Sequence, residues 1–126
     1  ILVICIFTDI GGFVFGKIIG GKKLTSISPK KTFSGLIGSF IFALLFGFIV
    51  YKFLNDLIYI NLNIFLFIIL ISFISQIGDL SISYLKRMAK LKDTGNILPG
   101  HGGILDRIDG ILLALPFSII LIIITS

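Results

Sequence analysis

Cysteine and histidine are almost absent from this chain of 126 residues, which contains one of each. The single Cys5 excludes an internal disulfide, and with His101 as the sole histidine the usual ligands of a zinc site are missing. Charge is also scarce, because only 13% of the residues are charged and six are acidic. The mean hydropathy of +1.15 lies far from the mixed composition of a soluble domain. These absences favour a bilayer as the solvent of the chain.

Most of the chain consists of long apolar runs. Four of them are long enough to cross a membrane, since a spanning helix needs about 20 mostly apolar residues. The expected spans are Ile1 to Ile19, Leu36 to Leu54, Leu57 to Gly78 and Gly110 to Thr125. No internal repeat or low-complexity segment is visible. We therefore predict an all-α, polytopic membrane protein with four membrane-spanning helices, in which residues 1–126 form a single integral membrane domain.

The ends of the sequence suggest an excerpt of a longer protein. The chain begins with Ile1 and ends within an apolar run, so we expect further N-terminal helices beyond it. The first run is not expected to be a cleaved signal peptide, because no basic segment precedes it and Asp9 interrupts it.

Basic residues are distributed unevenly, and their placement predicts the orientation of the chain. Two of the loops between the expected spans carry nearly all of them, and only Lys52 falls in the remaining connection. The first loop has Lys17, Lys22, Lys23, Lys30 and Lys31, and the third has Lys86, Arg87, Lys90, Lys92 and Arg107. The positive-inside rule makes both basic loops cytoplasmic. Attraction to anionic lipid headgroups would explain them, and so would an anionic substrate.

The acidic residues are candidates for function, because a carboxylate at membrane depth costs roughly 2.5 to 3.5 kcal/mol to insert. Asp9 lies within the first apolar run, where a structural role is as open as a functional one, and Asp79 lies at the end of the third. Asp106 and Asp109 are three residues apart, so a helix that begins near Ile104 would point both to one side. With Asp79 they offer three hard oxygen ligands suited to Mg²⁺.

Basic and glycine-rich sequence surrounds these acids. Acids and cations together suit phosphoryl chemistry, in which a metal holds bridging oxygens while Lys and Arg stabilise developing charge. The neighbouring cations are Lys86, Arg87, Lys90, Lys92 and Arg107. The loop glycines are Gly95, Gly100, Gly102 and Gly103. They could present backbone N–H groups to phosphate, or they could form only a flexible loop.

Three further features carry less weight. Gly16 to Lys23 nearly fits the phosphate-binding pattern GxxxxGK[ST], but Lys23 replaces the Ser or Thr, and a membrane run precedes the segment instead of a strand. The basic segment from Ser28 to Lys31 has no soluble domain around it, so no nucleic-acid partner is predicted. His101 is interpreted as a phosphate contact or a loop-ordering residue.

The segment from Ser83 to Asp109, SYLKRMAKLKDTGNILPGHGGILDRID, resembles the signature of the phosphatidate cytidylyltransferase (CDP-diacylglycerol synthase) family. The positions in register are Ser83, Lys86, Arg87, Lys92, Asp93, Gly95, Pro99, His101, Gly102, Gly103, Asp106, Arg107 and Asp109. The stretches TDIGGFVFGK, ISPKKT and QIGDLSIS extend the resemblance over nearly the whole chain. Departures occur at Ser34, where the family usually has Glu or Gln, and between Lys23 and Ser28, where the segment is shortened.

The resemblance implies transfer of the cytidylyl group of CTP to phosphatidic acid, which yields CDP-diacylglycerol and pyrophosphate and requires Mg²⁺. It implies Asp79 and Asp106 as metal ligands, with Asp109 close by. The predicted catalytic residues are Asp79, Asp106, Asp109 and Lys92. The predicted substrate-binding residues are Ser83, Lys86, Arg87, Asp93, His101, Arg107, Lys30 and Lys31. The expected partners are CTP, phosphatidic acid and membrane lipids, and the expected location is the bacterial inner (plasma) membrane.

Two other functions stay open at this point. One is a related CTP-dependent transferase with another acceptor, such as an archaeal ether lipid or a polyprenol. The other is an ion-coupled transporter that uses Asp9 and Asp79 as intramembrane ion ligands. The DGxxAR hallmark of CDP-alcohol phosphotransferases is absent from the sequence. A homodimer through the spans is compatible with the sequence, although no motif specifies it.

Overall fold

The structure is a computed structural model that describes residues 1–26, 31–54, 62–90 and 105–125, without the side chains of residues 105–108. The helices are α1 (Leu2–Ile18), α2 (Phe33–Phe53), α3 (Ile64–Met88) and α4 (Leu105–Thr125). Within these ranges, the β-type pairing is limited to an isolated bridge between Lys23 and Thr32. The predicted all-α class is confirmed for the part of the chain that the structure describes.

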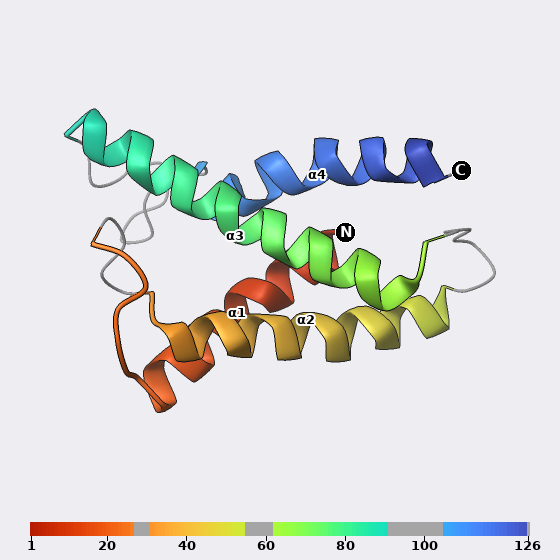
Figure 1. Cartoon of the computed structure of the whole chain (residues 1–126), viewed down its shortest axis with the longest axis horizontal. Coiled ribbons are helices and arrows are strands. Elements are labelled where there is room, and N and C mark those ends of the chain that lie inside the picture. Colours follow the sequence, from red (N-terminus) through yellow and green to blue (C-terminus); the bar gives the residue numbers. More distant parts are fainter. Residues whose placement is uncertain (27–30, 55–61, 91–104, 126) are drawn as a thin grey trace.

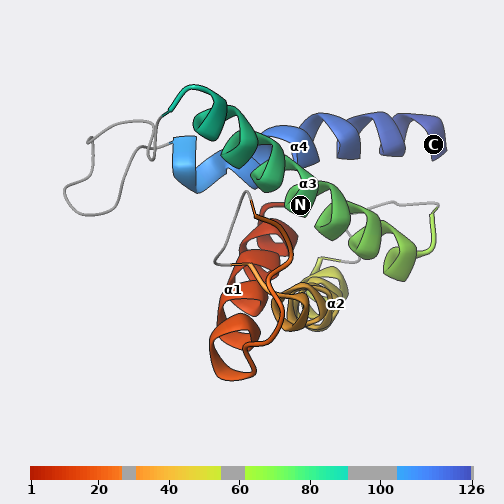
Figure 2. The same cartoon turned by 60° about the vertical axis from the view of Figure 1, so that its left-hand side comes forward.

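The four helices form two pairs, with α1 packed chiefly against α2 and α3 chiefly against α4 (Figures 1 and 2). α3 also contacts α2, and α1 contacts each of the other three helices. α2 leads away from the end of the molecule at which α1 finishes, and α3 returns to that end (Figure 1). The end of α1, the end of α3 and the start of α4 therefore lie at one end of the molecule.

Glycines allow α1 and α2 to approach closely. A Cβ atom added at Gly11 would lie 2.5 Å from the Gly38 carbonyl oxygen, and one added at Gly35 would lie 2.7 Å from the Gly12 carbonyl oxygen. Small residues at a helix crossing are typical of membrane helices. In lipid the hydrophobic effect does not hold helices together, so close van der Waals contact between their backbones stabilises the crossing. The backbones of α1 and α2 therefore touch at this crossing.

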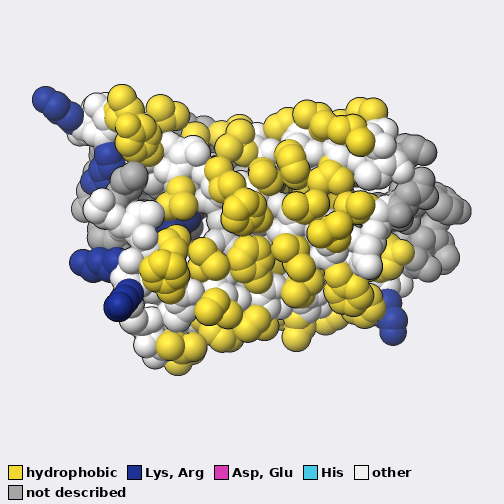
Figure 3. Space-filling view, viewed as in Figure 1, with side chains coloured by type: hydrophobic (Ala, Val, Ile, Leu, Met, Phe, Trp, Pro, Cys, Tyr) yellow, Lys and Arg dark blue, Asp and Glu magenta, His cyan; other side chains and the backbone are white. Residues whose placement is uncertain are grey.

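Hydroxyl side chains fill much of the interior, while large apolar side chains cover the outside. Thr8, Ser72, Ser75 and Ser118 are fully buried. The Thr8 and Ser72 hydroxyl oxygens lie 2.9 Å apart and join α1 to α3. Figure 3 shows an apolar band between two ends that carry Lys or Arg. This distribution is the reverse of that in a soluble protein and suits a surrounding of lipid.

Two helices are long and apolar enough to cross a membrane. They are α2, with 21 residues, and α3, with 25 residues, which each contain an 18-residue window of high mean hydropathy, 2.3 in α2 and 2.1 in α3. Among the described residues, α1 has 17 residues, and the apolar helical stretch Asp109–Thr125 is also short. The expectation of four spans therefore stays a prediction.

The third helix differs from the predicted span at both ends. The sequence predicts a span from Leu57 to Gly78, but α3 begins at Ile64 and continues to Met88. At the start, the Asn63 side chain accepts the Phe65 backbone N–H at 3.0 Å and caps the helix. At the C-terminal end, hydropathy predicts only where the apolar residues stop. The helix itself continues, because Leu, Lys, Arg and Met all have high helix propensity. The prediction that Lys86 and Arg87 lie in the third loop is therefore wrong, because both lie on α3.

Smaller differences occur at α2 and α4. α2 begins at Phe33 instead of Leu36, because Thr32 caps the helix by accepting the Gly35 backbone N–H at 3.1 Å. α4 begins at Leu105, which agrees with the predicted start near Ile104. The prediction that Asp106 and Asp109 share the first turns of one helix is thus confirmed.

Candidate active site

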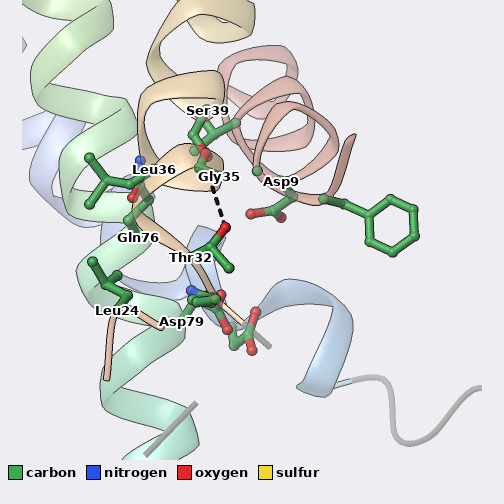
Figure 4. Close-up of a pocket in the computed structure, with 13 residues that line it drawn as sticks. Asp9, Leu24, Thr32, Gly35, Leu36, Ser39, Gln76 and Asp79 are labelled. Carbon is green, nitrogen blue, oxygen red and sulfur yellow. Dashed lines mark hydrogen bonds and ion pairs between the residues drawn. The ribbon is translucent and has the colours of Figure 1, made fainter. Parts of the chain in front are cut away.

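A pocket of about 360 Å³ gathers residues from all four helices and from the loop between α1 and α2 (Figure 4). Three acidic side chains line it: Asp9 of α1, Asp79 of α3 and Asp109 of α4. Lys31 of the loop and the uncharged Gln76 of α3 also line it. Residues far apart in the sequence therefore bring charged and polar side chains together in one cavity.

Asp79 and Asp109 meet because α3 and α4 cross closely at two glycines. A Cβ atom added at Gly78 would lie 3.1 Å from the Asp109 carbonyl oxygen, and one added at Gly110 would lie 2.6 Å from Ser75 Oγ. The Asp109 carboxyl lies close enough to the Asp79 carboxyl for the two groups to interact electrostatically. Asp109 is buried, and its Oδ1 accepts the Gly110 backbone N–H at 2.8 Å. Two carboxyl groups this close need a proton or a cation between them.

Lys31 supplies a cation to this pair, since its Nζ forms an ion pair with Asp79 Oδ2. Asp9 interacts electrostatically with both Asp79 and Lys31, so it belongs to the same charge cluster. The structure therefore places Asp9 on the wall of the pocket, within electrostatic range of charges on two other segments. We use the name acidic cluster for Asp9, Asp79 and Asp109.

The loop between α1 and α2 brings Lys31 to the pocket by turning back on itself. Gly20 and Gly21 have φ angles of 64° and 108°, in the left-handed region that ends a helix without steric cost for glycine. Beyond this turn, the Leu24 backbone N–H donates to the Lys31 carbonyl oxygen at 2.7 Å. The two arms of the loop are thus held together, and Lys31 lies beside α3.

Ser34 closes the same loop onto the end of α1. Its hydroxyl donates to the Gly20 carbonyl oxygen, and its Oγ lies 2.9 Å from Thr32 Oγ1. Because Ser34 has a single hydroxyl proton, Thr32 is the donor in the second of these bonds. At the position where the resembled family usually has Glu or Gln, this chain thus uses a short hydroxyl side chain to fasten the loop.

The other predicted site residues lie around the pocket or outside the described part of the chain. Ser83, Lys86 and Arg87 lie on the last turns of α3, beyond Asp79 and outside the pocket lining. Asp106 and Arg107 lie on the first turn of α4, but their side chains are outside the described residues. Lys30, Lys92, Asp93 and His101 also lie outside the described residues. The roles of all these residues stay predictions.

Sequence analysis missed the uncharged polar lining of the pocket. Gln76 lines it together with Thr8, Thr32 and Ser39. The signal available for Gln76 is helical spacing, because it precedes Asp79 by three residues and so faces the same side of α3. For the hydroxyl residues no such signal exists, since Ser and Thr also fill helix contacts throughout this chain.

The donor set of the pocket fits a magnesium ion in part. Mg²⁺ favours carboxylate oxygens, of which the protein often supplies one or two while water and phosphate complete the shell. Asp79 and Asp109 present adjacent carboxyl groups that need a cation between them. Among the described residues, no group of three acidic, histidine or cysteine side chains could hold a metal ion. The predicted partner of Asp79, Asp106, lies one turn before Asp109 on α4, with its side chain outside the description.

Comparison with known proteins agrees with this arrangement. The sequence profile that describes the Cytidylyltransferase family matches residues 1–125. The chain belongs to the Cytidylyltransferase family. A match over this length covers all four helices and the whole pocket.

Relatives within the Cytidylyltransferase family include several bacterial proteins named phosphatidate cytidylyltransferase. That of Staphylococcus haemolyticus (strain JCSC1435) is 44% identical over 120 residues, which cover 92% of this chain and 45% of the relative. That of Rickettsia bellii (strain RML369-C) is 46% identical over 115 residues, which cover 86% and 49%. That of Bacillus subtilis (strain 168) is 43% identical over 111 residues, which cover 87% and 41%. The chain thus spans about half the length of the curated relatives it matches.

A solved structure has the same fold. It is described as an intramembrane enzyme for archaeal membrane lipids biosynthesis, and it superposes with a TM-score of 0.65. The alignment covers 96% of this chain and 77% of the other, at 20% sequence identity. The helical arrangement as a whole is therefore shared, while identity at this level shows the fold alone.

Proposed function

We propose that this chain carries the catalytic pocket of a phosphatidate cytidylyltransferase, which transfers the cytidylyl group of CTP to phosphatidic acid and releases pyrophosphate. The observation that carries the proposal is the meeting of Asp79, Asp109 and Lys31 in one pocket. Acids beside a cation suit a metal-assisted phosphoryl transfer. The family membership and the names of the bacterial relatives support the same acceptor.

The proposed reaction needs no covalent enzyme intermediate. An oxygen of the phosphatidate phosphate attacks the α-phosphorus of CTP in line, a new P–O bond forms, and pyrophosphate leaves. The residues of the chain position the two phosphates and neutralise their charge. Lys31 lies where it can move from Asp79 to a phosphate oxygen, and Lys86 and Arg87 lie on the end of α3. Lys92, His101 and Arg107 are predicted to add phosphate contacts.

Asp79 and Asp106 would hold Mg²⁺, with Asp109 supporting the site. When bound, Mg²⁺ supplies neutralisation of phosphate charge and polarisation of the phosphorus. Without an ion, the ion pair of Lys31 with Asp79 balances part of the negative charge of the acidic cluster.

We further propose that the chain spans a bacterial inner membrane with the pocket on the cytoplasmic side. Lysines and arginines gather at one end of the apolar band in Figure 3, and Lys52 lies at the end of α2 toward the other. The positive-inside rule makes the first end cytoplasmic. CTP would then reach the pocket from the cytosol, and the lipid would reach it from the leaflet.

The full-length protein in lipid nanodiscs tests the function. Incubation with CTP, Mg²⁺ and dioleoyl phosphatidate is expected to release pyrophosphate and to form a CDP-linked lipid detectable by mass spectrometry. Diacylglycerol in place of phosphatidate is the control, because it lacks the attacking phosphate oxygen. Pyrophosphate release with a polyprenyl phosphate but not with phosphatidate would overturn the assigned acceptor.

Lys31→Met is expected to lower kcat/KM for pyrophosphate release by a factor of about 10², with the helices intact. Methionine keeps the length of the side chain but leaves Asp79 without the cation that pairs with it. The matched control is Lys52→Met, since Lys52 lies in the last turn of α2, away from the pocket. Equal activity of the two variants would contradict a role for Lys31.

A further inference from the structure

Gln76 lines the pocket and has a buried hydrogen-bond donor. Its Nε2 atom is buried and has no hydrogen-bond partner among the described residues. Gln76 and Asp79 both reach from α3 into the pocket (Figure 4). A buried amide without a partner is costly and rare in folded proteins, so we expect this amide to pair with an acceptor when a ligand occupies the pocket.

The other polar groups in this part of the pocket already have partners. The Ser39 hydroxyl donates to the Gly35 carbonyl oxygen at 3.0 Å. The Thr8 hydroxyl oxygen lies 2.7 Å from the Ile4 carbonyl oxygen and 2.9 Å from Ser72 Oγ. The hydrogen bonds of these two hydroxyl groups are thus made to other atoms of the protein. Gln76 differs from these neighbours in having a donor without a partner among the described residues. The buried Ser75 Oγ also has no such partner, but Ser75 does not line the pocket.

The position of Gln76 along α3 indicates which part of a ligand it meets. It lies three residues before Asp79, which corresponds to about 4.5 Å along the helix axis. α3 continues from Asp79 to the basic Lys86 and Arg87, so Gln76 lies on the side of Asp79 away from the basic end. With the phosphate of the lipid at Asp79, the glycerol backbone and its ester groups are the part of the lipid that extends in this direction.

We propose that the Gln76 carboxamide donates a hydrogen bond to an ester carbonyl oxygen of the acceptor lipid and thereby selects acyl ester lipids over ether lipids. The inference rests on the proposed function. An ether lipid has no carbonyl oxygen at this position, so its binding leaves the buried amide unpaired. A site built around such a bond discriminates strongly against the analogue that lacks it. The cytosine base of CTP also has a carbonyl oxygen that could accept the hydrogen bond from Gln76. The kinetic test below distinguishes these two acceptors.

The test compares dioleoyl phosphatidate with the matching dialkyl ether phosphatidate, with the full-length protein in nanodiscs. For the wild type, kcat/KM is expected to be about tenfold higher with the ester lipid. Gln76→Met has a side chain of similar length and no donor. It is expected to lower kcat/KM for the ester lipid about tenfold and to bring the ester-to-ether ratio close to one, with the KM for CTP unchanged.

Ser81→Ala is the matched control, because Ser81 lies on the same helix, donates to the Ile77 carbonyl oxygen and does not line the pocket. It is expected to keep the wild-type ratio. An ester-to-ether ratio near one in the wild type overturns the inference without any variant. A raised KM for CTP with an unchanged lipid ratio in Gln76→Met overturns it in favour of the cytosine carbonyl. No pyrophosphate release by the wild type with either lipid overturns the proposed function itself.

Discussion

Asp79→Asn is expected to lower Mg²⁺-dependent release of pyrophosphate from CTP and phosphatidate by a factor on the order of 10³. Asparagine keeps the size and one acceptor oxygen, so the helix contacts should stay intact. It removes the negative charge that pairs with Lys31 and that is proposed to hold the metal ion. Asp79 also interacts electrostatically with both Asp9 and Asp109.

Two measurements separate loss of catalysis from loss of fold. Size-exclusion chromatography in detergent and a thermal unfolding midpoint close to that of the wild type would show that Asp79→Asn folds. Raising the Mg²⁺ concentration is expected to restore part of the activity, since a weakened metal site still fills at high concentration. Activity within threefold of the wild type at low Mg²⁺ would refute the metal assignment of Asp79.

Gly11→Ala is expected to destabilise the protein by about 2 kcal/mol, because overpacking at a close contact costs about 1–3 kcal/mol. The added methyl group would lie 2.5 Å from the Gly38 carbonyl oxygen and 2.7 Å from Phe42 Cβ. A backbone carbonyl cannot rotate away, so α1 must move from α2. The gain in helix propensity from Gly to Ala, about 1 kcal/mol, offsets only part of this cost.

Gly47→Ala is the matched control for this prediction, since it makes the same chemical change on α2. The nearest atom to its added methyl group is Ile68 Cδ1 at 3.1 Å, at the flexible end of a side chain. Its thermal unfolding midpoint is expected to stay near that of the wild type. A midpoint for Gly11→Ala equal to that for Gly47→Ala would show that the α1–α2 contact is less tight than the structure has it.

Movement of α1 also has a consequence for activity. Asp9 is held on the pocket wall by α1, and the Thr8–Ser72 hydrogen bond fastens the same turn to α3. Gly11→Ala is therefore expected to reduce pyrophosphate release at temperatures where the protein is still folded. Stability and activity are linked at this crossing because the glycine contact sets the distance of α1 from the rest of the site.

The helix class could be predicted because a buried backbone in lipid must satisfy its own hydrogen bonds, which long apolar runs achieve only as helices. The extent of α3 could not be predicted in this way. Helix formation continues through Ser83, Lys86 and Arg87, where hydropathy no longer reports it. As a consequence, these residues lie on a rigid helix that continues from Asp79.

Composition and apolar runs by themselves determined the helical class, the resemblance of the segment from Ser83 to Asp109 indicated the family, and the position of the acids in apolar sequence marked them as candidates for function. Only the tertiary structure decided that Asp9 and Lys31 join Asp79 and Asp109 and that Gln76 lines the same pocket. The physical reason is that the meeting of these side chains depends on how closely the helices cross and on how the loop between α1 and α2 folds back toward α3. Glycines at the α1–α2 and α3–α4 contacts control the first, and the backbone pairing of Leu24 with Lys31 controls the second.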